Sequence, residues 1–581
     1  MMKRLTYTAL FLFLVVFAGC KKDDEFLKET PGDFLTIDNA FLNYAQFKTG
    51  LNELYRQVRL DYNNRDNGDD FFHFGSGTDN IFVPVPAGAA FTDWSLINPT
   101  RGIFNDVFTR HFQIIYNANN ILAQSENPAV SLTDEQKLTV QAEARLFRAY
   151  GYRYLSYMFG GVPIIDKPAT TPNLAFTRNT RAEVYDFCIK DLEFASANLP
   201  TTTSEPGRLV KAAADHYLAE MYIALGDETK NSSLYTKAIE AATRVIDGTD
   251  GDYHLMTERF GWRKDVPGKN VFWDMFQMRS PSSQSNYNYQ SGNKEAIWVM
   301  QIDKFLTGGL NTTLPTRTDQ ERAFWPSFWA LEKFGYSGPA RDWMGRGISM
   351  VRPTNYFTYY LWNAADSNDM RNSPVNIQRV FYAPDPIING KEVPNYDTTY
   401  KTNVTLFDGS KIVVSLKPGD PIKKEWLTSR QDTMERVFPR VMKMGSDWHY
   451  NGDPSNGFAQ ESYAIRLAET YLVRAEAYMK AGNPDLAAAD INVVRDRAGA
   501  TPVTPGEVNI DYILDERIRE LFGEELHTLT LCRLGLLYDR TKRFGQIESQ
   551  QTVMPKNNLM PIPQAVIDAN NQADFPQNPG Y

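Results

Sequence analysis

The stretch "YLVRAEAYMKAGNPDLAAADINVVRDRAG", Tyr471 to Gly499, decides the fold class of this chain. Its small and apolar residues recur every three or four positions on both sides of a Gly-Asn-Pro turn, which predicts two amphipathic helices. Small residues where the helices would cross allow close packing, as in a tetratricopeptide repeat. The positions that fit this pattern are Tyr471, Ala475, Tyr478, Ala487, Ile491 and Val494.

The same pattern recurs earlier in the chain. It surrounds Ala219 and Ala238, with the insertion "ETKNSSLY" lengthening the turn between the two helices. About three repeats are needed to bury a continuous core, so "AEARLFRAYGYRYL" and "RAEVYDFCIKDLEFA" are expected to form another pair. The predicted fold class is mainly α, with tetratricopeptide-like helical pairs, a large loop-rich insertion and a few short strands.

Composition along the chain predicts five segments. Residues 1–19 read as a signal peptide, 20–40 as a tether, 41–253 as a helical region, 254–452 as a loop-rich ligand-binding insertion, and 453–581 as a second helical region. Within the insertion, "EAIWVMQI" and "KIVVSLK" have the composition of short strands. The prolines and glycines near the C-terminus forbid a continuous helix, so an extended strap over the body is expected there.

The N-terminus has the layout of an exported protein. Lys3 and Arg4 precede an apolar run from Ala9 to Ala18, which is too short to span a membrane. A cysteine directly after Ala-Gly resembles the lipobox of bacterial lipoproteins, although Phe17 stands where leucine is usual. Cys20 is therefore expected to be lipidated and to anchor the chain. An ordinary secretory signal is the alternative.

Charge and cysteine content exclude other classes. The net charge of −9 opposes binding to polyanions, so nucleic acid is not an expected partner. Besides Cys20, the chain has Cys188 and Cys532, too few for a disulfide scaffold. The helical spacing around Cys188 predicts a buried thiol.

Four stretches together identify a family. They are "AEARLFRAYGYRYLSYMFGGVPII" (142–165), "AIRLAETYLVRAEAYMKAG" (464–482), "ILDERIRELFGEELHTLTLCR" (513–533) and "MPIPQAVIDAN" with "FPQNPGY" (560–581). With the lipobox, they resemble the SusD/RagB outer-membrane lipoproteins over the whole chain. The resemblance implies a surface-exposed protein of the outer membrane, without catalytic activity or cofactor. It also implies that the chain captures an oligosaccharide, or a peptide, and delivers it to a SusC-like TonB-dependent transporter.

The motifs for catalysis and metal binding give little support to an enzyme. The six histidines are dispersed and form no zinc motif, and no nucleophile elbow or phosphate-binding loop occurs. Paired carboxylates are abundant, so a surface glycoside hydrolase stays open as an alternative. A scaffold that binds only protein, or a lid that binds peptide, also stays open as an alternative function. "DYNNRDNGDD" (61–70) has the oxygen donors for structural calcium but not the usual loop spacing, so a solvated turn is preferred.

Ligand-binding residues are expected on loops that combine aromatic and polar side chains. An aromatic ring covers the C–H face of a sugar while polar side chains bond its hydroxyls. Two stretches, 75–102 and 322–343, meet this condition, and the family resemblance implies a ligand held between them. Burial in the core is an open alternative for every tryptophan. The tyrosines of "NYFTYY" (355–360) are weaker candidates for ligand binding. The candidates are Asp79, Trp94, Asn98, Arg101, Trp325, Trp329 and Tyr336.

Overall fold

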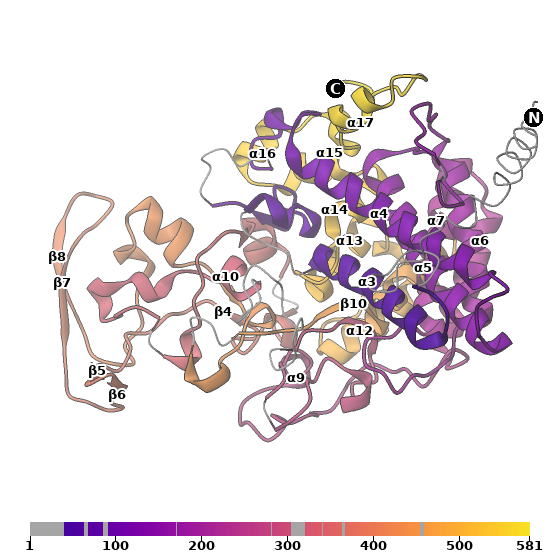
Figure 1. The fold of residues 1–581 in the computed structure, drawn as a ribbon. Helices are drawn as coiled ribbons and strands as arrows, with labels where there is room; N and C mark the ends of the chain where they lie inside the picture. Colours follow the sequence, from indigo (N-terminus) through magenta and orange to yellow (C-terminus); the bar gives the residue numbers. More distant parts are fainter. Residues whose placement is uncertain are drawn as a thin grey trace, which may run out of the picture.

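The computed structural model confirms a mainly α-helical fold (Figure 1). It describes residues 40–62, 68–84, 91–169, 171–280, 282–303, 320–339, 341–362, 366–453 and 458–581. Within these ranges, each helix falls short of the length or apolar character required for crossing a bilayer.

The tetratricopeptide-like pairs form one continuous stack of helices. Each helix of the stack packs on the next, and α8 packs directly on α11 although the whole insertion separates them in sequence. Two further helices, α3 (Tyr44–Tyr62) and α4 (Gly102–Ser125), cover α5. The stack consists of α5 (Asp134–Phe159), α6 (Arg181–Asn198), α7 (Lys211–Thr229), α8 (Ser233–Ile246), α11 (Leu467–Lys480) and α12 (Pro484–Ala498).

Local sequence signals define the ends of these helices. Thr133 and Thr180 begin α5 and α6, each with a capping box that satisfies free backbone N–H groups. Pro484 opens α12, and Gly499 closes it with a φ of 70°, a conformation that favours glycine. The stack buries Cys188 completely, which confirms the prediction for this thiol.

Buried and part-buried ion pairs connect the helices of the stack. Arg148 Nε donates to Asp191 Oδ2 at 2.7 Å and joins α5 to α6. Arg474 Nε donates to Asp490 Oδ2 at 2.8 Å and joins α11 to α12. Because charges buried between packed helices need a compensating partner, these arginines serve to hold neighbouring helices together.

The insertion carries short strands and a core of its own. As predicted, "EAIWVMQI" contains β2 (Ala296–Met300), which pairs with β10 (Ser462–Arg466), and "KIVVSLK" contains β8 (Lys411–Leu416), which pairs with β7 (Tyr400–Thr405). The β7–β8 hairpin lies at the far end of the molecule from the helical stack (Figure 1). It packs on a small separate apolar cluster that includes Phe328, Phe334, Tyr336, Val404 and Val414.

A buried network of charges attaches the insertion to α13 (Ile510–Leu521). Arg371, from the insertion, donates to Glu516 Oε1 at 2.7 Å and to Glu520 Oε2 at 2.8 Å. Arg466 donates to Glu520 Oε1 at 2.6 Å and to Glu295 Oε1 at 2.7 Å. Since all these groups are buried, removing one partner would leave the remaining charges less well compensated.

The C-terminal part of the chain packs on the body as short helices joined by extended segments. Four helices precede or interrupt the expected strap: α14 (His527–Leu534), α15 (Leu537–Phe544), α16 (Ile547–Thr552) and α17 (Gln564–Ala569). Met560 N donates to Met158 O at 2.7 Å, and Asn578 Nδ2 donates to Phe159 O at 2.9 Å. The terminal segment therefore lies across the C-terminal end of α5.

Candidate ligand-binding groove

The first predicted loop, 75–102, places its two leading candidates in the core. Trp94 is 1% exposed, and its indole Nε1 donates to Gly77 O at 2.9 Å. Asp79 is fully buried, where it accepts hydrogen bonds from His527 Nε2 at 2.8 Å and Arg540 Nε at 2.7 Å. The core alternative therefore holds for Trp94, whose indole bonds its own loop. Asp79 is not exposed either, because His527 of α14 and Arg540 of α15 supply its partners.

The second predicted stretch also turns inward. Trp325 is buried with its Nε1 bonded to Val441 O at 2.8 Å, and Tyr336 is buried with its hydroxyl bonded to Tyr382 O at 2.7 Å. Trp329 keeps part of its surface, and its Nε1 donates to Gly347 O at 2.7 Å. The core alternative thus holds for Trp325, and Tyr336 is buried as well, in a different apolar cluster.

Three candidates keep exposed surface. Asn98 is exposed and its Oδ1 accepts from Thr100 N at 3.0 Å, which is the geometry of a turn. Arg101 is partly exposed and occupies the N-cap position of α4. Direct ligand contact by Asn98, Arg101 and Trp329 stays a prediction.

One exposed aromatic side chain and two part-buried ones lie instead in a groove between the insertion and α15–α16. The groove has a volume of about 440 Å³, within the usual range of ligand sites. Tyr360 is 76% exposed, and Tyr356 stacks on Phe544 with ring centroids 4.1 Å apart and planes 23° apart. We call it the aromatic groove; its residues are Asn355, Tyr356, Tyr360, Arg543, Phe544, Gly545, Gln546, Ile547 and Gln550.

The wall contributed by the insertion is fixed by the loop that contains Asp79. Strand β1 (Ile81–Phe82) pairs with β3 (Arg352–Pro353), directly before the single helical turn Tyr356–Tyr360. Thr354 N donates to Asn80 O at 2.9 Å, and Thr354 Oγ1 donates to Asp79 O at 2.6 Å. The backbone of this loop thereby sets the position of both groove tyrosines.

The wall contributed by α15 and α16 is fixed by the same loop. Arg540, on α15, bonds the Asp79 carboxylate, and Thr552 Oγ1 at the end of α16 accepts from Trp94 N at 2.9 Å. Ser549 Oγ donates to Thr92 O at 3.2 Å. The predicted candidates Asp79 and Trp94 therefore fix α15 and α16 through buried contacts, although neither side chain is exposed in the groove.

Charges around the aromatic groove are paired. Arg543 Nη1 and Nη2 donate to the two oxygens of Asp511 at 2.9 and 2.8 Å. The Tyr356 hydroxyl donates to Asp515 at 2.8 Å, and burial together with this carboxylate raises the pKa of Tyr356, so its ring stays neutral. What the groove offers a ligand is aromatic surface, the amides of Asn355, Gln546 and Gln550, and little net charge.

Two family models match most of the chain. The model described as "SusD family" matches residues 294–581, and the model described as "Starch-binding associating with outer membrane" matches residues 25–223. The chain belongs to the SusD family. The matched regions include both walls of the aromatic groove and the loop that fixes them.

Similar proteins have the same extent and fold as this SusD-family chain. SusD-like protein P2 of Formosa agariphila is 23% identical over 83% of this chain and 81% of its own length. Starch-binding protein SusD of Bacteroides thetaiotaomicron is 24% identical over 82% of this chain and 78% of its own. The structure of a laminarin binding SusD-like protein superposes with a TM-score of 0.62 at 22% identity, covering 93% of this chain and 100% of that one.

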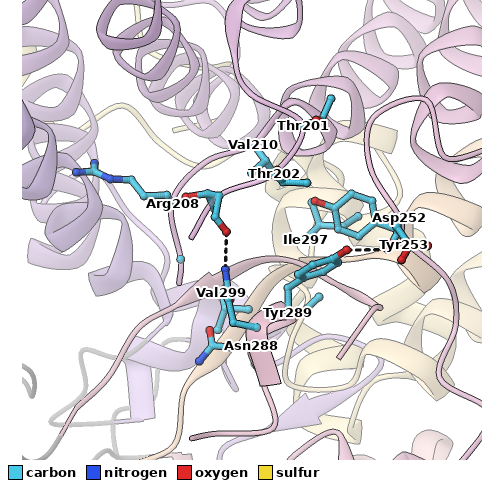
Figure 2. Close-up of a pocket in the computed structure, with 14 residues that line it drawn as sticks. Thr201, Thr202, Arg208, Val210, Asp252, Tyr253, Asn288, Tyr289, Ile297 and Val299 are labelled. Carbon is cyan, nitrogen blue, oxygen red and sulfur yellow. Dashed lines mark hydrogen bonds between the residues drawn. The ribbon is translucent and has the colours of Figure 1, made fainter. Parts of the chain in front are cut away.

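Other hollows on this SusD-family chain fit a sugar less well. The cavity of Figure 2, beside Tyr253 and Tyr289, has a volume of about 30 Å³, room for about one water molecule. A neighbouring hollow of about 490 Å³ is bordered by Arg56 and Arg208, both paired with glutamates. A third, of about 570 Å³, is lined mainly by apolar side chains.

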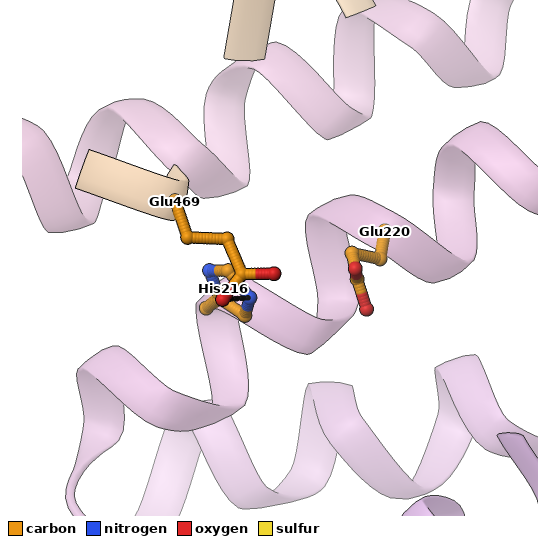
Figure 3. A group of neighbouring side chains, drawn as sticks. All are labelled: His216, Glu220 and Glu469. Atoms are coloured by element: carbon orange, nitrogen blue, oxygen red, sulfur yellow. Dashed lines mark ion pairs between the residues drawn. The ribbon is translucent and has the colours of Figure 1, made fainter. Parts of the chain in front are cut away.

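One cluster of potential metal ligands lies within the stack. His216, Glu220 and Glu469 approach one another at the α7–α11 contact (Figure 3). Arg153 donates to Glu220 at 2.7 Å and Arg517 donates to Glu469 at 2.7 Å, so both carboxylates already have cationic partners. Burial lowers the pKa of His216 to about 4, and its Nδ1 lies 2.9 Å from Thr470 Oγ1. The cluster is a compensated structural network of α7, α11 and α13.

Several predictions fall wholly or partly outside the described residues. They include the signal peptide (1–19), the tether (20–40) except its last residue, and Cys20, the expected lipidation site. The calcium alternative at 61–70 is another, and only its edges are described. At one edge, Asp61 faces the core, where it accepts from Tyr150 at 2.9 Å and contacts His111 Nε2 at 3.2 Å. Asp61 is therefore engaged by the helical body, and calcium binding stays untested.

Proposed function

We propose that this chain is a cell-surface glycan-binding lipoprotein that captures an oligosaccharide in the aromatic groove and delivers it to a SusC-like TonB-dependent transporter. The observation that carries the proposal is the exposed Tyr360 beside the stacked pair Tyr356 and Phe544. The names of two relatives, one starch-binding and one laminarin binding, support a glycan as cargo.

The chemistry of the groove favours an uncharged glycan. A sugar ring placed on Tyr360 buries its C–H face against the aromatic plane, while the amides of Asn355, Gln546 and Gln550 bond its hydroxyls. Arg543 borders the groove, but Asp511 neutralises its guanidinium. A polymer of uronic acids would find no unpaired cation in this set of residues.

Anchoring and transport complete the proposal. Lipid on Cys20 would hold the protein at the outer membrane, in agreement with the description of the family model that matches residues 25–223. Metabolic labelling with a fatty-acid analogue tests this step. We expect label on the wild-type chain and none on Cys20→Ala; label on both chains would contradict it.

Calorimetric titration of the chain from Lys21 tests capture. It is titrated with plant, microbial and host glycans and a peptide pool, while products are analysed in parallel. We expect heat with a neutral glycan and no product. Product formation would support a glycoside hydrolase, binding of peptides alone would support a peptide lid, and the absence of all binding would support a protein scaffold.

A further inference from the structure

The apolar hollow described above is a preformed groove along α4. Phe108, Phe112 and Tyr116 of α4 form its floor, Leu174 and Phe176 form one wall, and Val566 of α17 forms the other. Its described lining residues are all uncharged. We call it the α4 groove.

Hydrogen bonds fix the walls of the α4 groove to each other. Phe176 N donates to Asn570 Oδ1 at 2.7 Å, and Asn570 Nδ2 returns a bond to Phe176 O at 2.9 Å. Gln572 N donates to Leu174 O at 2.9 Å. The groove thus keeps its shape without an occupant, yet Tyr116 is 40% and Leu174 38% exposed. Exposed apolar surface of this kind is typical of an interaction site.

The chain itself supplies a segment of matching chemistry. The described body begins at residue 40, and Ser131 N donates to Leu42 O at 3.0 Å, shortly after the C-terminal end of α4. Just before it, the sequence "EFLKETPGDFLTID" (25–38) contains two uncharged apolar groups, Phe26-Leu27 and Phe34 to Ile37. Each of these two apolar groups, which are separated by Lys28, Glu29 and Asp33, fits an uncharged groove with a mainly apolar lining.

The segment is long enough to reach the groove. A helix rises about 1.5 Å per residue, so Tyr116 and Phe112 lie about 14 to 20 Å from the end of α4 at Ser125. Extended chain covers about 3.3 Å per residue, so Leu35 lies within about 23 Å of Leu42. We propose that residues 26–37 dock in the α4 groove, with Phe34 to Ile37 near Tyr116 and Phe26-Leu27 farther along α4.

Docking would shorten the connection to the membrane. With lipid on Cys20, which is part of the proposed function, the free linker shrinks from about 65 Å for residues 20–40 to about 20 Å for residues 20–26. The tether then orients the body at the membrane surface. The docking itself does not depend on lipid or on glycan binding.

Disulfide trapping in the chain from Lys21 tests the docking. With Leu35→Cys and Tyr116→Cys, we expect an intrachain disulfide to form at least tenfold faster than with Leu35→Cys and Leu138→Cys. Leu138 is the matched control, since it is 42% exposed and lies on α5 close to Ser131 but outside the groove. The native Cys188 and Cys532 are buried and do not compete.

A third substitution separates docking from random collision. Adding Leu174→Glu to the double variant Leu35→Cys, Tyr116→Cys should slow disulfide formation at least fivefold, with an unchanged melting temperature, because Leu174 is already partly exposed. Equal rates for the two double variants, or no effect of Leu174→Glu, would overturn the docking. Glycan titration of the same variants should match that of the wild type, so the docking can fail while glycan capture stands.

Discussion

Arg540 Nε donates to Asp79 Oδ2 at 2.7 Å, and both side chains are completely buried beneath the aromatic groove. The pair joins the loop before β1 to α15, the two parts of the chain that position the groove walls. Burial alone would raise the pKa of Asp79, but His527 and Arg540 hold it well below its usual range. Asp79 therefore stays ionised in the folded protein.

Replacing Asp79 tests whether the pair supports the groove. Asp79→Asn leaves Arg540 and His527 charged and buried, so we expect the free energy of unfolding to fall by about 3 kcal/mol. Denaturant unfolding measures this fall. Asp397→Asn is the control: Asp397 pairs with Lys417 at 3.5 Å on the surface, and a change of less than about 0.5 kcal/mol is expected. Equal effects of the two substitutions would contradict the structural role of Asp79.

His527 predicts a specific dependence of stability on pH. Burial would lower its pKa, but Asp79 and Glu525 raise it to about 9, above the value of about 6.5 in an unfolded chain. Its contribution to stability is therefore complete below about pH 6.5 and is lost as the pH rises through about 9. Unfolding measured from pH 6 to 10 should show this loss in the wild type and little of it in His527→Gln. Identical pH profiles for the wild type and His527→Gln would contradict a stabilising role of protonated His527.

Gly77 predicts a strict steric requirement next to Trp94. Its φ is +79°, and a Cβ atom there would lie 1.4 Å from Phe91 O. We expect Gly77→Ala to lower the free energy of unfolding by more than about 2 kcal/mol. Gly506→Ala is the matched control, since a Cβ at Gly506 meets no atom within 4 Å. A harmless Gly77→Ala would contradict the close approach of Phe91 O to Gly77.

The buried charge network predicts how firmly the insertion is attached. Arg371→Met leaves Glu516 and Glu520 with one cation fewer, so we expect a loss of about 3 kcal/mol and faster proteolysis within 366–441. Limited proteolysis followed by mass spectrometry gives the cleavage sites. Arg56→Met, which removes a surface pair with Glu53, should leave the cleavage pattern unchanged.

The helical stack could be predicted from sequence because its signals are local. Periodic small and apolar residues, capping threonines and the Gly-Asn-Pro turn all act within a few positions. The sequence also identified β2 and β8 from their Val and Ile content. The partner of β2, strand β10, and the direct contact of α8 with α11 depend on chain closure across the insertion.

None of the seven predicted ligand-binding residues lines the aromatic groove, and four of them are buried: Asp79, Trp94, Trp325 and Tyr336. Trp94 looks like a ligand platform in sequence because its neighbours are polar and turn-like, whereas Trp325 lies four residues from Trp329, a spacing that also fits a core. Composition does not reveal the carbonyl groups that the two indoles bond, Gly77 O in the same loop as Trp94 and Val441 O for Trp325. Tyr356 and Tyr360 ranked lower, although the mixture of aromatics with Asn355 in "NYFTYY" was the available signal.

The measurement that tests the central claim most directly is glycan titration of two matched variants of the chain from Lys21. Tyr360 and Phe407 are each 76% exposed, but Tyr360 lies in the aromatic groove and Phe407 lies at the tip of the β7–β8 hairpin. Loss of one stacking face costs about 1 kcal/mol or more. We therefore expect Tyr360→Ala to weaken glycan binding at least fivefold and Phe407→Ala to leave it unchanged. Unchanged affinity in Tyr360→Ala, or an equal loss in both variants, would contradict capture at this groove.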